Sequence, residues 1–433
     1  MSPDHQLGLV ILAIAALIVL SRLLGDLAER FGQPPVIGEL LLGILIGPSL
    51  LKAVAPDLVA SVLPAQVVTL LHGVGNLGLS LFIFLVGLEI DQSALRRRFD
   101  RVAKVAAGAF VPPFAAGVLT ATTLFSAHPG GGSQLAFTLL FGVVFACTAL
   151  PVLARILTDR GLERTSAGTM ALASAGVLDL VGWVILGSVL TIAAGHGLGG
   201  VLWKLVLFLV FVVVVKNVVV PLLLHWLHGA PTNGPMAQLA VLAATVFACA
   251  GTTQMIGLHI VIGPLVLGLL LPHQLLSERL GPIESALAPM TAGVLLPIYF
   301  ATAGMGVDVS GFSASDVLQF VLLLALATAP KVVGTILGAR WAGLSRREGL
   351  RLAVLLNTRG VMEVVVLNVG LSAGLLNVTL YSQLMIIALI ATAMTGPLIG
   401  RLCPRYEQAG ADGDPKYPAP SDADPAPTPS IAT

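Results

Sequence analysis

Asp179 places a carboxylate in the sequence GVLDLVGW (176–183), inside an apolar run from about residue 170 to residue 194. A charged side chain at the centre of a bilayer costs about 2.5–3.5 kcal/mol on insertion scales, so it persists where it is paired or used. Burial favours the protonated carboxyl group, and a nearby cation favours the ionised form. An aspartate balanced between these effects can exchange a proton for a metal cation. The alternative is a structural carboxylate that caps a broken helix or neutralises a lysine.

Few other charged residues fall inside the apolar runs of this chain. Lys331, in APKVVGT, either pairs with Asp179 or contacts the broken backbone of neighbouring helices. Arg155, Arg359 and Glu363 form a second group, and Glu363 follows Arg359 by four residues, which places both on one helix face. We expect these four residues to compensate charge, and the second group to hold two interrupted helices together as an ion-pair set.

Two apolar runs contain residues that interrupt a helix. CTALPVLARIL (147–157) has Pro151 in mid-span with Thr148 before it, and NTRGVMEVV (357–365) brings Asn357 and Thr358 to membrane depth. Proline removes a backbone donor, and broken backbone in a membrane must line a cavity or be buried in protein. The freed half-helix ends carry partial charges that point at a site. Thr148, Asn357 and Thr358 are therefore candidate oxygen ligands, beside Asp179, for a transported Na⁺ or K⁺. A kink that serves packing alone is the alternative for each run.

The composition identifies the elements that must position these residues. Of 433 residues, 56% are hydrophobic and only 10% are charged, whereas a soluble domain carries about 25% charged residues. The apolar runs are continuous and do not alternate, which predicts helices in a polytopic membrane protein. The net charge of +1 gives no indication of a nucleic-acid partner, and the three cysteines lack metal-ligand spacing. We expect no cofactor and no covalent chemistry.

The runs divide into about 13 transmembrane helices. We place them at about residues 6–24, 35–52, 66–90, 102–127, 134–158, 168–194, 199–227, 235–256, 258–272, 286–306, 315–340, 349–372 and 379–402. With the N-terminus outside, the inner loops receive most of the arginines, including the cluster RRRFDRVAK (96–104). This asymmetry predicts an outer N-terminus and a cytoplasmic C-terminus. Residues 1–403 form the predicted transmembrane domain, and the Pro-, Asp- and Ala-rich residues 404–433 a disordered cytoplasmic tail.

Two pairs of segments resemble each other at the same helix offset. VIGELLLGILIGP (36–48) resembles VIGPLVLGLLLP (261–272), and Gly43 corresponds to Gly268. FLVGLEID (84–91) resembles FATAGMGVD (300–308), and Gly87 corresponds to Gly304. Each pair lies seven helices apart, and an odd offset turns the second copy upside down in the membrane. This predicts an inverted repeat, which is typical of secondary transporters, and it pairs the two interrupted helices with each other.

Six segments together resemble the monovalent cation:proton antiporters of the Kef and sodium/hydrogen exchanger type. They are GELLLGILIGPSLL, LGLSLFIFLVGLEID, ACTALPVLARIL, VLDLVGW, LLPIYFATAGMGVD and NTRGVMEVVVLNVGL, spread from about residue 36 to residue 400. The resemblance implies a panel domain that makes homodimer contacts and a core domain built on two crossed, unwound helices. It also implies elevator-like alternating access, and an acidic pair on the sixth helix whose second member is Asp179. The first position is Leu178, where relatives carry Asp, Asn or Gln.

Leu178 cannot bind a cation, so a one-for-one electroneutral exchange is expected. The resemblance and Asp179 together predict a monovalent cation:proton antiporter of the cell inner (plasma) membrane, with the cation, the proton and the lipid bilayer as its partners. One alternative is a carrier of the same architecture that moves a small organic solute with the cation gradient. Another is a membrane sensor that no longer transports, for which Leu178 is the support.

Overall fold

The structure, a computed structural model, describes residues 3–89, 99–127, 133–159, 162, 165–195, 197–229, 235–272, 281–310 and 312–402. Every regular element in these ranges is helical. The helices are α1 (Pro3–Arg30), α2 (Pro35–Ile46), α3 (Leu51–Val54), α4 (Pro56–Val62), α5 (Ala65–Glu89), α7 (Phe99–Ala127), α8 (Gln134–Ala146), α9 (Leu150–Asp159), α10 (Ser166–Ala193), α11 (Gly197–Val214), the π-helix η1 (Val215–Val219), α12 (Val220–Gly229), α13 (Pro235–Met255), α14 (Ile262–Leu270), α16 (Gly281–Met290), the π-helix η3 (Thr291–Leu295), α17 (Leu296–Gly304), α18 (Ala314–Trp341), α19 (Arg346–Leu356), α20 (Val361–Ser372) and α21 (Val378–Leu402).

Nine helices among the described residues are long and apolar enough to cross a membrane. Shorter apolar helices lie at Pro35–Ile46, Gln134–Ala146 and Met362–Ser372. The two interrupted runs predicted from the sequence are each divided into two short helices, α8 with α9 and α19 with α20, so neither half reaches spanning length. The all-helical membrane architecture is confirmed, and the count of 13 spans stays a prediction. The tail at 404–433 lies outside the described residues.

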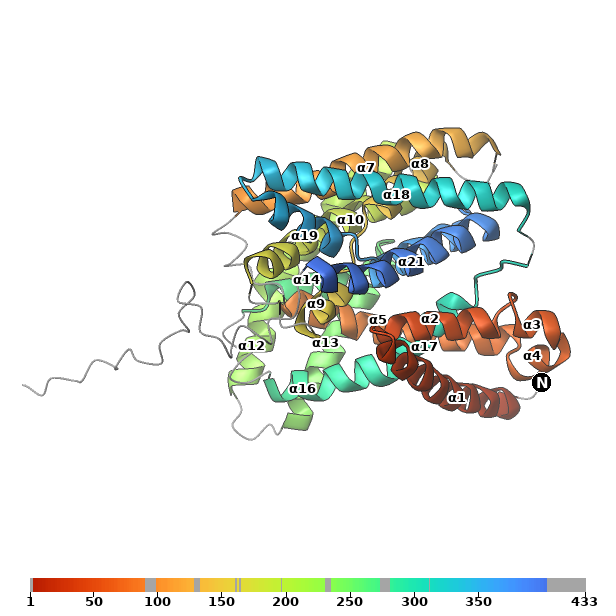
Figure 1. Cartoon of the computed structure of the whole chain (residues 1–433). Helices are drawn as coiled ribbons and strands as arrows, with labels where there is room; N and C mark the ends of the chain where they lie inside the picture. The colour runs from red at the N-terminus through yellow and green to blue at the C-terminus, as the bar shows by residue number, and fades with distance from the viewer. Residues whose placement is uncertain are drawn as a thin grey trace, which may run out of the picture.

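The helices form two groups (Figure 1). In the panel group, α2 packs on α1 and α17, and α5 packs on α14 and α17. In the core group, α7 runs along α18 and α8, while α10 packs on α8 and α19. Figure 1 draws α7 and α18 as long neighbouring helices in its upper half, and α1, α2, α5 and α17 in its lower half. The candidate site residues come from α10, α18 and the two interrupted pairs of helices, α8 with α9 and α19 with α20.

Close contacts between glycines reproduce the internal repeat. A Cβ atom at Gly43 of α2 would lie 2.7 Å from Gly304 Cα of α17, and one at Gly87 of α5 would lie 3.1 Å from Gly268 Cα of α14. The sequence repeat equates Gly43 with Gly268 and Gly87 with Gly304, so the two contacts are copies of one another. Helix backbones approach this closely only where the residues are small. The two halves of the panel group therefore share the same close glycine contact.

Capping residues determine where two of the core helices begin. Thr165 accepts a hydrogen bond from the backbone N–H of Gly168, 3.0 Å away, at the start of α10. Ser345 and Glu348 form a reciprocal capping box that begins α19. The backbone N–H and the hydroxyl group of Ser345 hold the pKa of the Glu348 carboxyl below its ordinary value. These caps set where α10 and α19 begin, and hence the depth at which their polar residues lie.

Candidate functional site

The two interrupted helices cross at their breaks. Residues 147–149 separate α8 from α9, and residues 357–360 separate α19 from α20. The backbone N–H of Ala149 donates to the Thr358 carbonyl at 3.0 Å, and the Thr148 hydroxyl donates to the Leu356 carbonyl at 2.9 Å. The backbone groups freed by each break thus bond to the other break. This is how irregular backbone is satisfied away from water.

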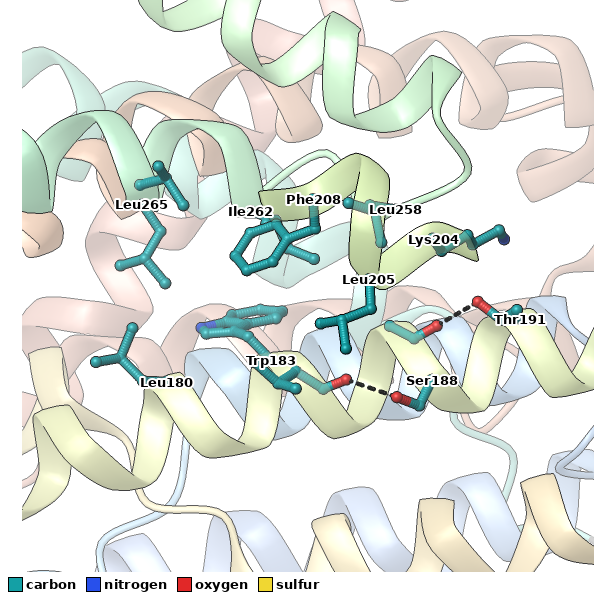
Figure 2. Close-up of a pocket in the computed structure, with 13 residues that line it drawn as sticks. Leu180, Trp183, Ser188, Thr191, Lys204, Leu205, Phe208, Leu258, Ile262 and Leu265 are labelled. Atoms are coloured by element: carbon teal, nitrogen blue, oxygen red, sulfur yellow. Dashed lines mark hydrogen bonds between the residues drawn. The ribbon is translucent and has the colours of Figure 1, made fainter. Parts of the chain in front are cut away.

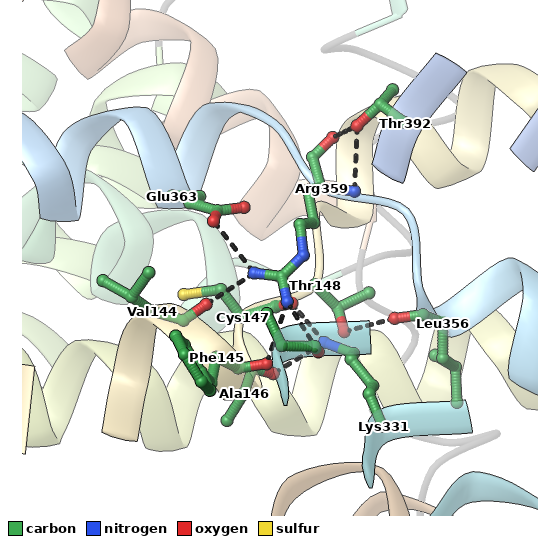
Figure 3. A network of polar contacts seen from close by, with 11 residues as sticks. Val144, Phe145, Ala146, Cys147, Thr148, Lys331, Leu356, Arg359, Glu363 and Thr392 are labelled. Carbon is green, nitrogen blue, oxygen red and sulfur yellow. Dashed lines mark hydrogen bonds and ion pairs between the residues drawn. The ribbon is translucent and has the colours of Figure 1, made fainter. Parts of the chain in front are cut away.

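Two cations neutralise the carboxyl end of α8. A helix leaves its last four carbonyl groups without intrahelical partners, and these carry partial negative charge. Lys331 of α18 and Arg359 both reach this end, and both side chains are fully buried. Figure 3 draws these contacts. Lys331 Nζ donates to the carbonyls of Ala146, at 2.8 Å, and Cys147, while Arg359 donates to those of Val144, at 2.7 Å, and Phe145, at 3.2 Å.

Lys331 therefore contacts the broken backbone, which is one of the two arrangements that the sequence leaves open. Asp179 is near enough for the Lys331 charge to act on its carboxyl group. However, no ion pair joins Asp179 to Lys331 in the described part of the chain. Lys331 is thus bonded to backbone carbonyls, and Asp179 has no ion-pair partner among these described residues.

Asp179 lies in the middle of α10, and only 5% of its surface is exposed. Its carboxyl group accepts a hydrogen bond from the backbone N–H of Leu150, the first residue of α9. The amino end of a helix carries partial positive charge, which favours an anion there. Among the described residues, Asp179 Oδ1 has no hydrogen-bond partner. A buried carboxylate oxygen without a partner is costly, so this atom is the strongest candidate in the site for binding a proton or a cation.

Arg359 and Glu363 form the buried ion pair of the crossing. Arg359 Nη1 lies 2.9 Å from Glu363 Oε1, and Arg359 Nη2 donates to the Ala327 carbonyl of α18 at 3.0 Å. The planar guanidinium group, with five donors, can serve three helices at once. Arg155, the third residue expected in this set, lies in α9, and its side chain is outside the described residues.

Asn357 and Thr358 occupy the second break. The Thr358 hydroxyl donates to the Leu355 carbonyl at 2.7 Å, so it satisfies a helix end and keeps an oxygen lone pair. Asn357 is 6% exposed, and its Oδ1 atom has no hydrogen-bond partner within the described ranges. Thr148 is buried at the first break. The structure thus brings the predicted oxygen ligands to one crossing. Three buried acceptor atoms there have no partner among the described residues, one each on Asp179, Asn357 and Glu363.

Thr392 of α21 is a contributor that the sequence reasoning missed. Its hydroxyl donates to the Arg359 carbonyl at 2.5 Å and accepts from the Arg359 backbone N–H at 3.1 Å, so it holds the second break in place. A signal was present, because Thr392 and Thr395 are three residues apart in an otherwise apolar helix and therefore share a face. Leu178, in contrast, is buried in the apolar core.

Known proteins resemble this chain over most of its length. The family described as "Sodium/hydrogen exchanger, transmembrane" matches residues 12–403. The Na(+)/H(+) antiporter NhaS4 of Synechocystis is 33% identical over 407 residues, which cover 92% of this chain and 98% of that protein. Cation/H(+) antiporter 19 of Arabidopsis thaliana is 33% identical over 405 residues, which cover 92% of this chain and 50% of that protein. The chain spans about half the length of the plant relatives that it matches.

A solved structure has the same fold. The sodium proton antiporter MjNhaP1 of Methanocaldococcus jannaschii, at pH 8, superposes with a TM-score of 0.61 and 17% sequence identity. The match covers 91% of this chain and 96% of that one. At this identity the match establishes the fold alone.

Proposed function

The chain belongs to the sodium/hydrogen exchanger family, and we propose that it exchanges a monovalent cation, Na⁺ or K⁺, for protons across a membrane. The printed names of its relatives include both Na(+)/H(+) and K(+)/H(+) antiporters, so both cations stay open for this chain. The observation that carries the proposal is the buried Asp179 carboxylate, which faces the amino end of α9 with one oxygen unpartnered. As a carrier, the protein performs no covalent chemistry.

In this proposal Asp179 binds either a proton or the cation, but not both. The bound cation takes oxygen ligands from the Asp179 carboxylate, the Asn357 amide, and the hydroxyl or carbonyl groups of Thr148 and Thr358. Oxygen ligands suit alkali cations because these ions are hard and are held by electrostatic attraction to hard donor atoms. When the proton is bound, the site is neutral and the cation leaves. One carboxylate thus couples the two fluxes by competition.

The remaining charges hold the breaks in place. Lys331 and Arg359 neutralise the carbonyl end of α8, and Glu363 balances Arg359. Arg155 is proposed to add a further compensating charge on α9. Lys331, Arg359 and Glu363 are bonded to backbone or to one another. In this proposal they keep their charges through the cycle, and Asp179 is the group that changes its charge.

The assembly and placement of the chain are also part of the proposal. We propose a homodimer in the plasma membrane, with the N-terminus outside and the C-terminus in the cytoplasm. The support for orientation is the concentration of arginines in alternate loops, above all residues 96–98. The support for the dimer is the family resemblance of the panel helices.

Proton movement in everted vesicles tests the exchange. A pH-sensitive dye reports the collapse of an imposed pH gradient when Na⁺, K⁺ or Li⁺ is added separately. Wild-type protein should release protons in response to at least one cation. Asp179→Asn should reduce this to the level of vesicles without the protein, because an amide cannot exchange a proton for a cation. The matched control is Asp57→Asn, the same substitution at an exposed position of α4, which should transport normally.

Two outcomes would overturn the proposal. Transport by Asp179→Asn at the wild-type rate would remove Asp179 from the site. If wild-type protein, present and folded, responds to no cation between about pH 6 and 9, antiport itself is excluded, and the solute-carrier and sensor hypotheses become the ones to test. The pH range brackets the region where a buried carboxylate is tuned to exchange protons.

A further inference from the structure

A cavity of about 140 Å³ lies beside α10, on the turns that follow Asp179. A cavity of about 10–15 Å³ already holds one water molecule, so this cavity is far larger than a packing defect. Figure 2 shows α10 as one wall and side chains of α11 and α14 as the other. The lining residues on α10 are Leu180, Trp183, Val184, Gly187, Ser188 and Thr191. Their spacing of three and four residues places them along one face of the helix.

The cavity has the length of one bilayer leaflet. From Leu180 to Thr191 the α-helix advances about 16 Å, at about 1.5 Å per residue. Half of a hydrocarbon core of about 30 Å is about 15 Å. Thr191 lies two residues before the end of its span at Ala193, so it is near the membrane surface, whereas Leu180 is near the middle. A slot of this length matches an acyl chain that enters from one leaflet.

The walls of the slot are apolar, and the slot opens sideways. Phe208 of α11 and Ile262 and Leu265 of α14 face α10 across it. Two residues at its edge are strongly exposed, Val184 with 51% of its surface and Leu205 with 42%. In a membrane-spanning helix, exposed aliphatic side chains face lipid. The slot therefore communicates with the lipid phase.

The Lys204 side chain lies at the end of the slot that is nearest the membrane surface. Lys204 lies two residues into its span, which begins at Leu202, and its Nζ donates to the Gly257 carbonyl at 2.9 Å. An ammonium group has three donors, so two remain. No carboxylate pairs with Lys204 in the described part of the chain. A lysine at this depth attracts anionic headgroups.

We propose that the slot between α10, α11 and α14 binds one anionic phospholipid, with an acyl chain along α10 from Thr191 towards Leu180 and the headgroup phosphate on Lys204. The occupant is a lipid because the slot opens to the bilayer, has the length of one leaflet and is apolar except at the surface end. It is anionic because Lys204 is the charged residue that lines the slot. The lipid would contact α10, which carries Asp179, and α14 of the panel group together. Because the lipid would contact both groups of helices, the lipid composition of the membrane would affect any movement of the core group relative to the panel group. This consequence rests on the proposed exchange function.

Lipid counting by native mass spectrometry tests the site without any transport assay. Detergent-purified protein is incubated with equal concentrations of dioleoyl phosphatidylglycerol or dioleoyl phosphatidylcholine. Wild-type protein should retain one more phosphatidylglycerol per chain than phosphatidylcholine. Lys204→Gln should raise about fivefold the phosphatidylglycerol concentration needed for half-occupancy, since one basic residue near a membrane surface contributes about that factor in affinity.

A second variant fills the slot directly. Gly187 faces the cavity, and a Cβ atom there would lie 3.5 Å from Leu258 Cδ2, an ordinary contact. Gly187→Ala should therefore keep the lipid, while the larger side chain of Gly187→Leu should expel either lipid. Equal phosphatidylglycerol occupancy in wild type, Lys204→Gln and Gly187→Leu would overturn the site, and equal retention of the two lipids by wild type would overturn its anionic character. Gel filtration and thermal unfolding establish that each variant is folded. If only one of the two variants folds, unchanged phosphatidylglycerol occupancy in that variant overturns the site.

Discussion

Burial separates two ion pairs that look alike in the sequence. Arg359–Glu363 and Arg22–Asp26 both have a spacing of four residues and N–O distances of 2.9 and 3.0 Å, but their side chains are 0% and 1% exposed in the first pair and 67% and 45% in the second. Removing one partner of a buried pair costs about 3–5 kcal/mol, because the other charge is left buried alone. We predict that Arg359→Met lowers the thermal stability of the purified protein severely, whereas Arg22→Met changes it little, since an exposed pair contributes about 0–1 kcal/mol.

The double substitution provides the decisive comparison. Arg359→Met with Glu363→Met removes both charges, so its loss of stability should be smaller than the sum of the two single losses. Some loss should remain, because the carbonyls of Val144, Phe145 and Ala327 also lose their donor. Strictly additive losses in unfolding scans would contradict a coupled pair and would point to the backbone contacts alone.

The sequence identified these charged residues but not all of their contacts. The spacing of Arg359 and Glu363 was sufficient to place them on one helix face, because helix geometry fixes which neighbours meet. The carbonyl contacts of Lys331 had no comparable signal, since any residue type supplies a backbone oxygen. Asp179 was found as a charge in an apolar run, but its approach to the Leu150 N–H depends on how α10 packs against α9.

Glycine contacts between helices define the geometry of the panel group. A Cβ atom at Gly87 of α5 would lie 2.8 Å from the Leu265 carbonyl and 3.1 Å from Gly268 Cα. We predict that Gly87→Ala forces α5 and α14 apart and lowers the unfolding temperature, at a cost of about 1–3 kcal/mol for overpacking. Gly73→Ala, on the same helix, is the matched control because nothing lies within 4 Å of its Cβ position. That substitution should be neutral or slightly stabilising, since alanine loses less backbone freedom than glycine in a helix.

The repeat makes this prediction stricter. Gly304 is the counterpart of Gly87, and a Cβ atom at Gly304 would lie 2.9 Å from Gly43 Cα, so Gly304→Ala should lose stability in the same direction. A loss at Gly87 without a loss at Gly304, measured at one scan rate, would contradict equivalent packing of the two halves.

Element types were easier to predict from the sequence than element boundaries. Long apolar runs predicted helices correctly, and Pro151 and the polar residues Asn357 and Thr358 marked the two interruptions. The short helices α3 and α4 within residues 51–62 and the π-helical turns η1 and η3 were not anticipated. Local backbone adjustments of this kind depend on packing between helices, and no sequence period reveals them.

At the scale of the whole molecule, the net charge moved across the membrane in one transport cycle depends on how many groups change protonation in that cycle. Leu178 stands where the family resemblance implies a first acidic residue, and it is buried in the apolar core, so Asp179 is the proposed carrier. Lys331 donates to two backbone carbonyls, and Arg359 is held by Glu363 and by carbonyls. With these charges fixed, one cation moves one way and one proton moves the other way, and the net charge moved is zero.

We therefore predict that exchange by wild-type protein is independent of the membrane potential. Moving one elementary charge through 100 mV changes the free energy by about 2.3 kcal/mol, which would shift the cation gradient reached at equilibrium by about fiftyfold in an electrogenic carrier. Reconstituted vesicles with a fixed pH gradient and an imposed potential of either sign should reach the same cation gradient, with Asp179→Asn vesicles as the background. A potential-dependent gradient would mean that a second group titrates in the cycle, and Lys331, the buried cation whose charge acts on Asp179, would be the first group to test.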